Sequence, residues 1–291
     1  MSEPARPVRG LREADRFELK RRYPQAFRAP IAKRCLSLAI VVGGASLAVY
    51  TLWRFGFSPA KFVDGLDKLG IVVVLMMPPD PGSQFWHYAS ALAETLAIAF
   101  LGTLGAAIIA LPMSMLAARN VVANSILHFA SRRFLDTIRG VDTLIWALIW
   151  INVVGLGPFA GILAIMTSDF GSFGKLFSEA IEASDRKPVD GVVSAGGSEL
   201  HGFRFGILPQ VLPVLLSQVL YYFESNTRSA TIIGIVGAGG IGLYLANEIA
   251  QAEWQRVAFV ILMILVTVSV IDWFSSRLRL AMIGRRAGAT A

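Results

Sequence analysis

The chain has 291 residues, of which 55% are hydrophobic and 16% are charged, and its mean hydropathy is +0.59. This composition excludes a soluble domain with a polar surface and indicates a membrane protein. The net charge of +7 comes from basic residues beside apolar runs, which argues against nucleic acid as a partner. The single cysteine, Cys35, excludes an intramolecular disulfide, and the three histidines are too far apart in the sequence to predict a metal site.

Residues 1–34 form a basic arm with ten Lys or Arg residues and no long apolar run. We expect this arm to be solvated and cytoplasmic. The triplet Ser46-Leu47-Ala48 resembles a signal-peptide cleavage site, but it lies inside an apolar run, so we do not expect cleavage there.

A spanning helix needs about 20 mostly apolar residues, because the bilayer offers no water to its backbone polar groups. Six segments are predicted to cross, namely Cys35–Trp53, Tyr88–Ala118, Val141–Val154, Phe159–Phe177, Pro209–Ile235 and Val257–Phe274. The third and fourth meet at Gly155, Gly157 and Pro158, which predicts a hairpin inside the membrane. The segment Phe62–Met77 has an apolar core too short to cross, and we expect it at the interface or partly re-entrant.

Charge asymmetry predicts the orientation of these helices. Of the 27 Lys and Arg residues, 22 lie in the arm, in the loops 119–139 and 175–204, and in the tail from residue 277. Because positive residues stay cytoplasmic, both termini should lie inside the cell, which requires an even number of crossings. The sequence therefore predicts an all-α membrane protein of about six transmembrane helices. Its expected parts are the arm at 1–34, an N-terminal helix with the interfacial segment at 35–87, a core at 88–277 that includes a cytoplasmic loop at 178–206, and a basic cytoplasmic tail at 278–291.

No catalytic residues are predicted, because no Ser or Cys lies in a nucleophile motif and no pair of carboxylates has a context for acid–base chemistry. The string from Gly237 to Gly242 fits the G-x-G-x-x-G fingerprint of dinucleotide-binding folds. That fingerprint requires a preceding strand, whereas here a membrane helix precedes it. We interpret Gly237, Gly239, Gly240 and Gly242 as a sharp, closely packed turn on the outer side of the membrane, which only glycine allows cheaply.

The loop 178–206 is long and polar, and proline and glycine divide it into short helical pieces. Asp190-Gly191-Val192, Gly196 and Leu208-Pro209 have the spacing of the EAA loop of ABC importer permeases, which the segment resembles. In that family the loop forms two short helices that dock in a cleft of the ATPase subunit, with glycine at the turn between them. The resemblance implies a coupling site at Asp190, Gly191, Val192 and Gly196, and a membrane helix that begins at Leu208 and Pro209.

Some positions depart from the pattern of that loop. Asp190 replaces Glu, Gly191 and Val192 replace two Ala, and Gly206 stands where Ile is usual. The alternative interpretation is an ordinary glycine-punctuated cytoplasmic loop.

Other stretches resemble the phosphonate permease family, and the likeness extends from Ala91 to Phe274. They are Leu111–Asn120, Val154–Gly161, Asp185–Val189, Tyr222–Thr231 and Ile232–Gly242. The resemblance implies a type I ABC importer permease core with one extra N-terminal helix, surrounded by lipid in the cytoplasmic membrane of a bacterium. It also implies a homodimer of permeases, two ATPase subunits that bind ATP and Mg²⁺, a periplasmic or extracellular phosphonate-binding protein, and no cofactor on this chain.

Glu224 and Arg228 lie four residues apart on one face of a membrane helix, where pairing lowers the cost of holding charge in the membrane. Arg228 offers donors that match the oxygens of a phosphonate dianion, so both residues are candidates for the translocation path. A structural ion pair between helices is the alternative. Asn226 cannot share their face and is expected to contact another helix.

Two further functions stay open from the sequence. The same importer architecture could carry phosphate, phosphite or a solute such as methionine, although an arginine in the membrane suits a multiply charged anion better than a zwitterion. A membrane-bound enzyme or scaffold without transport would have no ATPase partner at the loop 178–206.

Overall fold

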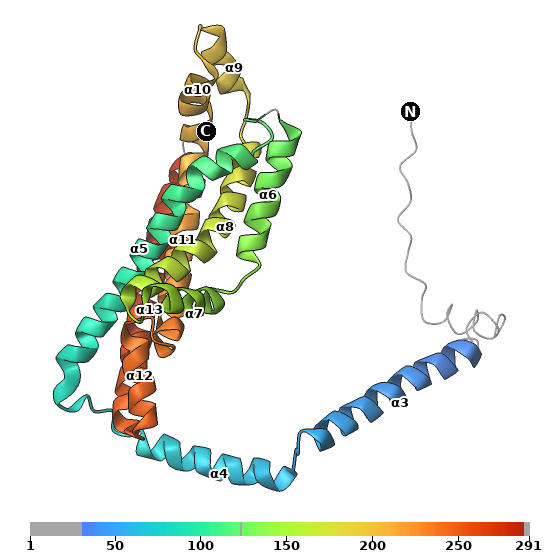
Figure 1. The fold of residues 1–291 in the computed structure, drawn as a ribbon, viewed down its shortest axis with the longest axis vertical. Helices are drawn as coiled ribbons and strands as arrows, with labels where there is room; N and C mark the ends of the chain where they lie inside the picture. Colours follow the sequence, from blue (N-terminus) through green and yellow to red (C-terminus); the bar gives the residue numbers. More distant parts are fainter. Residues whose placement is uncertain (1–30, 123, 288–291) are drawn as a thin grey trace, which may run out of the picture. The chain divides into compact units, whose positions relative to one another are not determined.

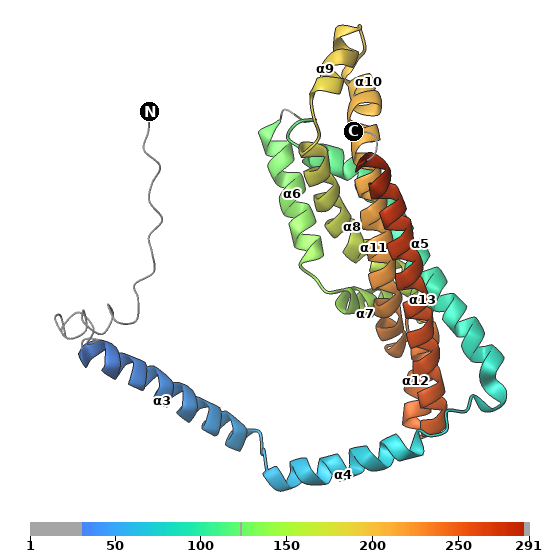
Figure 2. The ribbon, with the colours of Figure 1, turned by 180° about the vertical axis from the view of Figure 1, so that it is seen from behind.

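The computed structural model describes residues 31–122 and 124–287 (Figures 1 and 2). These residues form helices and turns without a β-strand, which agrees with the predicted fold class. The chain divides into two compact units at Gly70. Most of the predicted basic arm, residues 1–30, and the end of the predicted tail, residues 288–291, lie outside the described residues.

The N-terminal unit holds α3 (Ile31–Arg54) and the larger part of α4 (Pro59–Leu75). From Cys35 to Arg54, α3 has a mean hydropathy of 2.0, and 0% of this stretch is buried inside the protein. A helix of this length and composition suits a membrane, in agreement with the first predicted crossing. No residue of α4 is buried, and its place at the membrane interface stays a prediction.

The second unit is a bundle in which α5, α8 and α11 pack against one another (Figure 1). This unit contains the helices α5 (Phe85–Ala117), α6 (Ser125–Arg139), α7 (Thr143–Val154), α8 (Pro158–Glu182), α11 (Leu208–Ile235), α12 (Ile241–Ala250) and α13 (Trp254–Ala287). Both α6 and α7 pack on α8, and α13 packs on α11. Glycine allows a close approach between α5 and α8, because a Cβ on Gly102 would lie 2.8 Å from the Ile165 side chain.

Four of the described helices, α3, α5, α11 and α13, are long and apolar enough to cross a membrane. The pair α6 and α7, bent by 86°, passes the same test as one broken span and raises the number to five. The helix α8 is not among them, because it carries Asp169, Lys175 and Glu179 along its length. The prediction of six crossings therefore stays a prediction, although every predicted segment coincides with a helix.

The stretch from Arg119 to Arg139 is expected from the sequence to be a loop, and this expectation is wrong because most of it forms α6. The Asn124 side chain caps this helix by accepting hydrogen bonds from the N–H groups of Ile126 and Leu127. The exposed side of α6 carries apolar side chains such as Ile126, Phe129 and Phe134 beside the charged Arg133, while Leu135 is buried and packs against Gly174 of α8. Such an amphipathic helix has too many charges to stand out as an apolar span.

The helix α12 packs against α11 at glycines, so that backbone atoms are in direct contact. A Cβ on Gly242 would lie 1.9 Å from the carbonyl oxygen of Thr231, and a Cβ on Gly234 would lie 2.6 Å from the carbonyl oxygen of Gly239. Neither position has room for a side chain, so the two helices can approach each other only with glycine there.

We therefore expect Gly242→Val to unfold this end of the bundle. Overpacking against backbone that cannot move aside should cost about 3 kcal/mol or more. The measurement is the thermal unfolding midpoint of the purified protein in detergent. Gly44→Val in α3 is the matched control, because no atom lies within 4 Å of its Cβ position. Equal midpoints for the two variants would contradict the close contact.

Candidate functional site

The segment between α8 and α11 projects beyond the ends of α6 and α8 at one end of the bundle (Figures 1 and 2). It contains α9 (Lys187–Ser194), the short α10 (Glu199–His201) and a π-helical turn, η2 (Gly202–Ile207). The loop that the sequence predicts at 178–206 begins later, because residues 178–182 belong to α8, and we call residues 183–207 the coupling segment after the role predicted for that loop.

Gly196 makes the turn after α9. Its φ is +89°, a left-handed conformation that glycine adopts at little cost. The N–H of Gly196 donates to the Val193 carbonyl oxygen at 2.9 Å, and that of Gly197 donates to the Val192 carbonyl oxygen at 3.0 Å. These bonds satisfy carbonyl groups that the end of a helix would otherwise leave unpaired. The predicted turn between two helical pieces is therefore present, while its docking on an ATPase stays a prediction.

Gly206 departs from the family pattern for a local reason. A Cβ at this position would lie 2.9 Å from the Cα of Val189 in α9, so a side chain has no room there. Asp190 and Gly191 lie on α9 and are exposed. The helix α11 begins at Leu208, as predicted.

Two polar contacts attach the base of the coupling segment to the bundle. The Gln210 side chain of α11 accepts a hydrogen bond from the Asp185 N–H at 3.1 Å and donates one to the Asp185 carbonyl oxygen at 3.0 Å. On the other side, the Arg186 guanidinium donates to the Asn120 carbonyl oxygen at 3.2 Å. The segment is thus held both by α11 and by the chain that follows α5.

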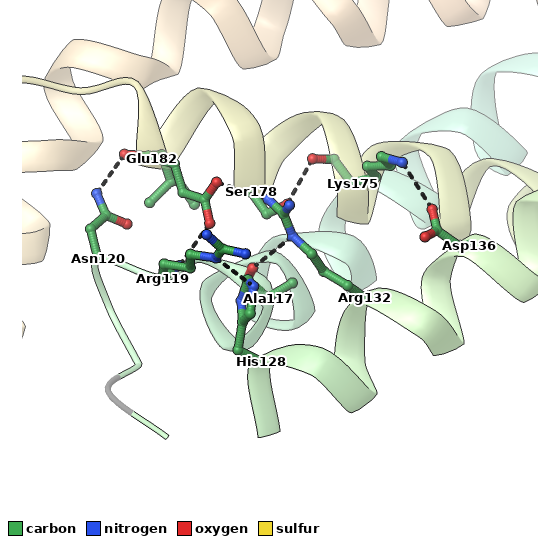
Figure 3. Close-up of polar contacts among 10 residues, drawn as sticks. Ala117, Arg119, Asn120, His128, Arg132, Asp136, Lys175, Ser178 and Glu182 are labelled. Atoms are coloured by element: carbon green, nitrogen blue, oxygen red, sulfur yellow. Dashed lines mark hydrogen bonds and ion pairs between the residues drawn. The ribbon is translucent and has the colours of Figure 1, made fainter. Parts of the chain in front are cut away.

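A polar cluster joins α5, α6 and α8 beside this base (Figure 3). One carboxylate oxygen of Glu182, the last residue of α8, accepts a hydrogen bond from the Arg119 backbone N–H at 2.8 Å. The other accepts one from the Arg132 guanidinium of α6, also at 2.8 Å. The Asn120 side chain donates to the Ile181 carbonyl oxygen at 2.8 Å. We call Arg119, Asn120, Arg132 and Glu182 the Glu182 cluster.

The sequence does not reveal this cluster. Glu182 is 63 residues away from Arg119 and 50 residues away from Arg132, so no local spacing connects them. The only signal is that Arg119 and Asn120 close a stretch that resembles phosphonate permeases.

Glu224 and Arg228 do lie together on α11, at 3.4 Å, and α13 adds two further charges. Arg279 lies closer to Glu224, at 2.9 Å, and Asp272 lies 3.6 Å from Arg228. The Glu224 side chain is only 12% exposed, whereas that of Arg228 is 51% exposed. Glu224 thus has the geometry of a tie between α11 and α13, while half of the Arg228 side chain remains accessible.

Asn226 contacts other helices, and that prediction is confirmed. Its side-chain amide donates to the Thr103 hydroxyl of α5 at 2.8 Å and to the Asp169 carboxylate of α8. All three side chains are buried. Neither Asp169 nor Thr103 stands out in the sequence, because neither belongs to a motif that indicates a site. Among the residues that the structure describes, no group of three or more His, Cys, Asp or Glu side chains could hold a metal ion.

The glycine string forms the turn between α11 and α12. Gly237, Gly239 and Gly240 have φ values of +101°, +85° and +80°, so the bend that the sequence predicts is present. Its place on the outer side of the membrane stays a prediction.

Two side chains of α5 satisfy the backbone of this turn. The Glu94 carboxylate accepts a hydrogen bond from the Gly240 N–H at 2.9 Å, and the Thr95 hydroxyl accepts one from the Ile241 N–H at 2.8 Å. The hairpin between α7 and α8 reaches the same place, because the Gly157 N–H donates to the Gly237 carbonyl oxygen at 3.0 Å. Two breaks in the helical bundle therefore support each other, and side chains of α5 support one of them.

Residues 110–283 match the family model described as the binding-protein-dependent transport system inner membrane component. The chain is 39% identical over 247 residues to the putative phosphite transport system permease protein HtxC of Stutzerimonas stutzeri, with 85% of this chain and 86% of that protein covered. It is 46% identical over 118 residues to the putative cryptic phosphonate transport system permease protein PhnE2 of Escherichia coli K12, with 40% and 97% covered.

The fold is similar to that of a chain in the inward-facing MetNI methionine ABC transporter. The TM-score is 0.59 at 19% identity, and the likeness covers 69% of this chain and 98% of that one. The family match and the relative aligned over most of its length show that this chain belongs to the inner membrane components of binding-protein-dependent transport systems, the permeases of ABC importers.

Proposed function

We propose that this chain is the permease subunit of an importer for phosphonates or a closely related phosphorus oxyanion. Two copies form the passage, two cytoplasmic ATPase subunits bind and hydrolyse ATP, and a periplasmic or extracellular binding protein delivers the substrate. The chain itself forms the passage and transmits the movement of the ATPases, and it is not an enzyme. Both of its termini, together with the coupling segment, lie on the cytoplasmic side.

The observation that carries this proposal is the coupling segment, two short helical pieces turned at Gly196 and projecting from the bundle. Val193, Leu200 and Phe205 in this segment have 47%, 70% and 58% of their surface exposed. Exposed apolar side chains on an otherwise polar segment that contains several glycines favour a protein partner. The ATPase cleft is the partner that the family resemblance implies, with Asp190, Gly191 and Val192 on the first of the two pieces.

The helix α11 supplies the candidate lining of the passage. Gln218, Tyr221, Ser225 and Arg228 recur every three or four residues and so share one face of the helix. A hollow of about 510 Å³ lies beside this face and is lined by Leu176, Pro213, Val214, Ser217, Gln218, Tyr221 and Tyr222. Polar side chains are costly against lipid, so this face favours the passage or a second copy of the chain.

The substrate class rests on the relatives. HtxC is named for phosphite and PhnE2 for phosphonate, and both substrates are phosphorus oxyanions. Phosphite is the second candidate, because the phosphite-named relative aligns with 85% of this chain. A methionine importer shares only the fold at 19% identity, which gives methionine no comparable support.

Reconstitution with the ATPase and the binding protein tests this function. We expect ATP hydrolysis in proteoliposomes to rise about tenfold when the binding protein is loaded with methylphosphonate or phosphite, since a loaded binding protein favours one of the two states of the transporter. Methionine and phosphate serve as comparison solutes. Stimulation by methionine alone, or failure of any ATPase to assemble with the chain, would contradict the proposal.

The turn of the coupling segment gives a second prediction. Gly196→Arg should abolish uptake while the protein remains inserted, because a side chain in the left-handed conformation costs about 1–2 kcal/mol and also obstructs docking. Gly65→Arg in α4 is the control, with no atom within 4 Å of its Cβ position and no positive φ. Co-purification of the ATPase measures docking. Normal uptake by Gly196→Arg would remove the coupling role from this turn.

The charges between α11 and α13 give a third prediction. Arg228→Ala should lower uptake about tenfold and leave assembly unchanged, as expected when one charge-assisted contact with the substrate is lost. Arg279→Ala should instead reduce the amount of folded complex, because Arg279 is 25% exposed and holds Glu224 at 2.9 Å. Size-exclusion profiles and uptake rates separate the two effects. If Arg228→Ala loses folded protein to the same extent, Arg228 is only part of the structural tie.

A further inference from the structure

The Glu182 cluster sits where the coupling segment leaves the bundle. Residue 183 begins the segment directly after Glu182, and the Glu182 carboxylate is bound to the chain that follows α5 and to α6. A shift of the coupling segment therefore acts on Glu182 before it acts on any other residue of α8.

The chain that follows α5 is held from both sides. Glu182 accepts the Arg119 N–H, Ile181 accepts the Asn120 amide, and Arg186 donates to the Asn120 carbonyl oxygen from within the coupling segment. Residues 119 and 120 are thus bonded both to the end of α8 and to the start of the coupling segment. These bonds stay intact only if residues 119 and 120, the end of α8 and the start of the coupling segment move together.

Arg132 extends the connection to α6. Its guanidinium donates to Glu182 at 2.8 Å, and its Nε donates to the Ala117 carbonyl oxygen at the end of α5 at 3.4 Å (Figure 3). His128 of α6 accepts a hydrogen bond from the Arg119 side chain at 3.0 Å. The Arg132 and Glu182 side chains are 24% and 25% exposed, so most of this ion pair is shielded from water.

We infer that Glu182 is a positioning residue that transmits movement of the coupling segment to α5 and α6. This inference rests on the proposed function, because it requires an ATPase to move the segment. Without the Glu182 carboxylate, movement would reach the bundle through α8 and α11 alone, and ATP hydrolysis would continue with less transport.

The test is the number of substrate molecules taken up per ATP hydrolysed, measured with the full transporter in proteoliposomes using labelled phosphite and methylphosphonate. Glu182→Ala should lower this ratio about tenfold while the ATPase still co-purifies, as expected for loss of two charge-assisted hydrogen bonds that act as one unit. Glu182→Gln should lower it only about threefold, because the amide oxygen can still accept the Arg119 N–H.

Asp136→Ala is the matched control for Glu182→Ala. It breaks another ion pair between α6 and α8, with Lys175 at 3.0 Å, that does not touch residues 117–120. Its coupling ratio should equal that of the wild type. A general loosening of α6 from α8 would lower the ratio in this variant as well and would overturn the assignment to Glu182.

Three other outcomes are decisive. An unchanged ratio in Glu182→Ala overturns the inference but leaves the proposed function intact. Failure of both Glu182 variants to assemble gives Glu182 a folding role and also overturns the inference. If the wild-type chain neither binds an ATPase nor takes up either anion, the proposed function itself fails.

Discussion

A membrane offers no water to the backbone, and this constraint governs the structure of the permease. Within a long helix the backbone N–H and C=O groups bond to one another. Each break in a helix leaves N–H groups that need an acceptor elsewhere. Two glutamates supply acceptors at two such breaks. Glu94 accepts from Gly240 in the turn between α11 and α12, and Glu182 accepts from Arg119 where the chain leaves α5. Carboxylates are strong acceptors, so each break is satisfied by a side chain from a different part of the sequence.

The same two contacts hold α5 in place near both of its ends, while Thr103 holds its middle through Asn226 and Asp169. Polar contacts therefore link α5 to the turn after α11 near one end and to both α8 and α11 in its middle, and they link the chain after α5 to α8 at the other end. The helix α13 is joined to α11 by the partly buried pair of Glu224 and Arg279 and by the more exposed pair of Arg228 and Asp272. Ion pairs thus attach the outer helix α13 to a central group of three helices that hydrogen bonds connect.

Much of the fold could be predicted from the sequence, because apolar length alone identifies helices such as α3, α5 and α13. The turn at Gly196 and the start of α11 could be predicted as well, since glycine and proline act locally. The helix α6 could not, because its charges conceal an amphipathic pattern. The partners of Glu182 and Glu94 could not be predicted, and neither could the contact of Glu224 with Arg279, because tertiary packing selects these partners across long sequence separations.

The turn between α11 and α12 explains why this chain carries a string that imitates a nucleotide-binding motif. In dinucleotide-binding folds the glycines admit a pyrophosphate to the backbone. Here they admit other protein atoms, since a Cβ on Gly240 would lie 2.4 Å from the Thr95 hydroxyl and one on Gly239 would lie 2.9 Å from the Pro158 nitrogen. Two unrelated folds thus share one spacing of glycines. In this chain the spacing reflects close packing around a bend and does not indicate a ligand.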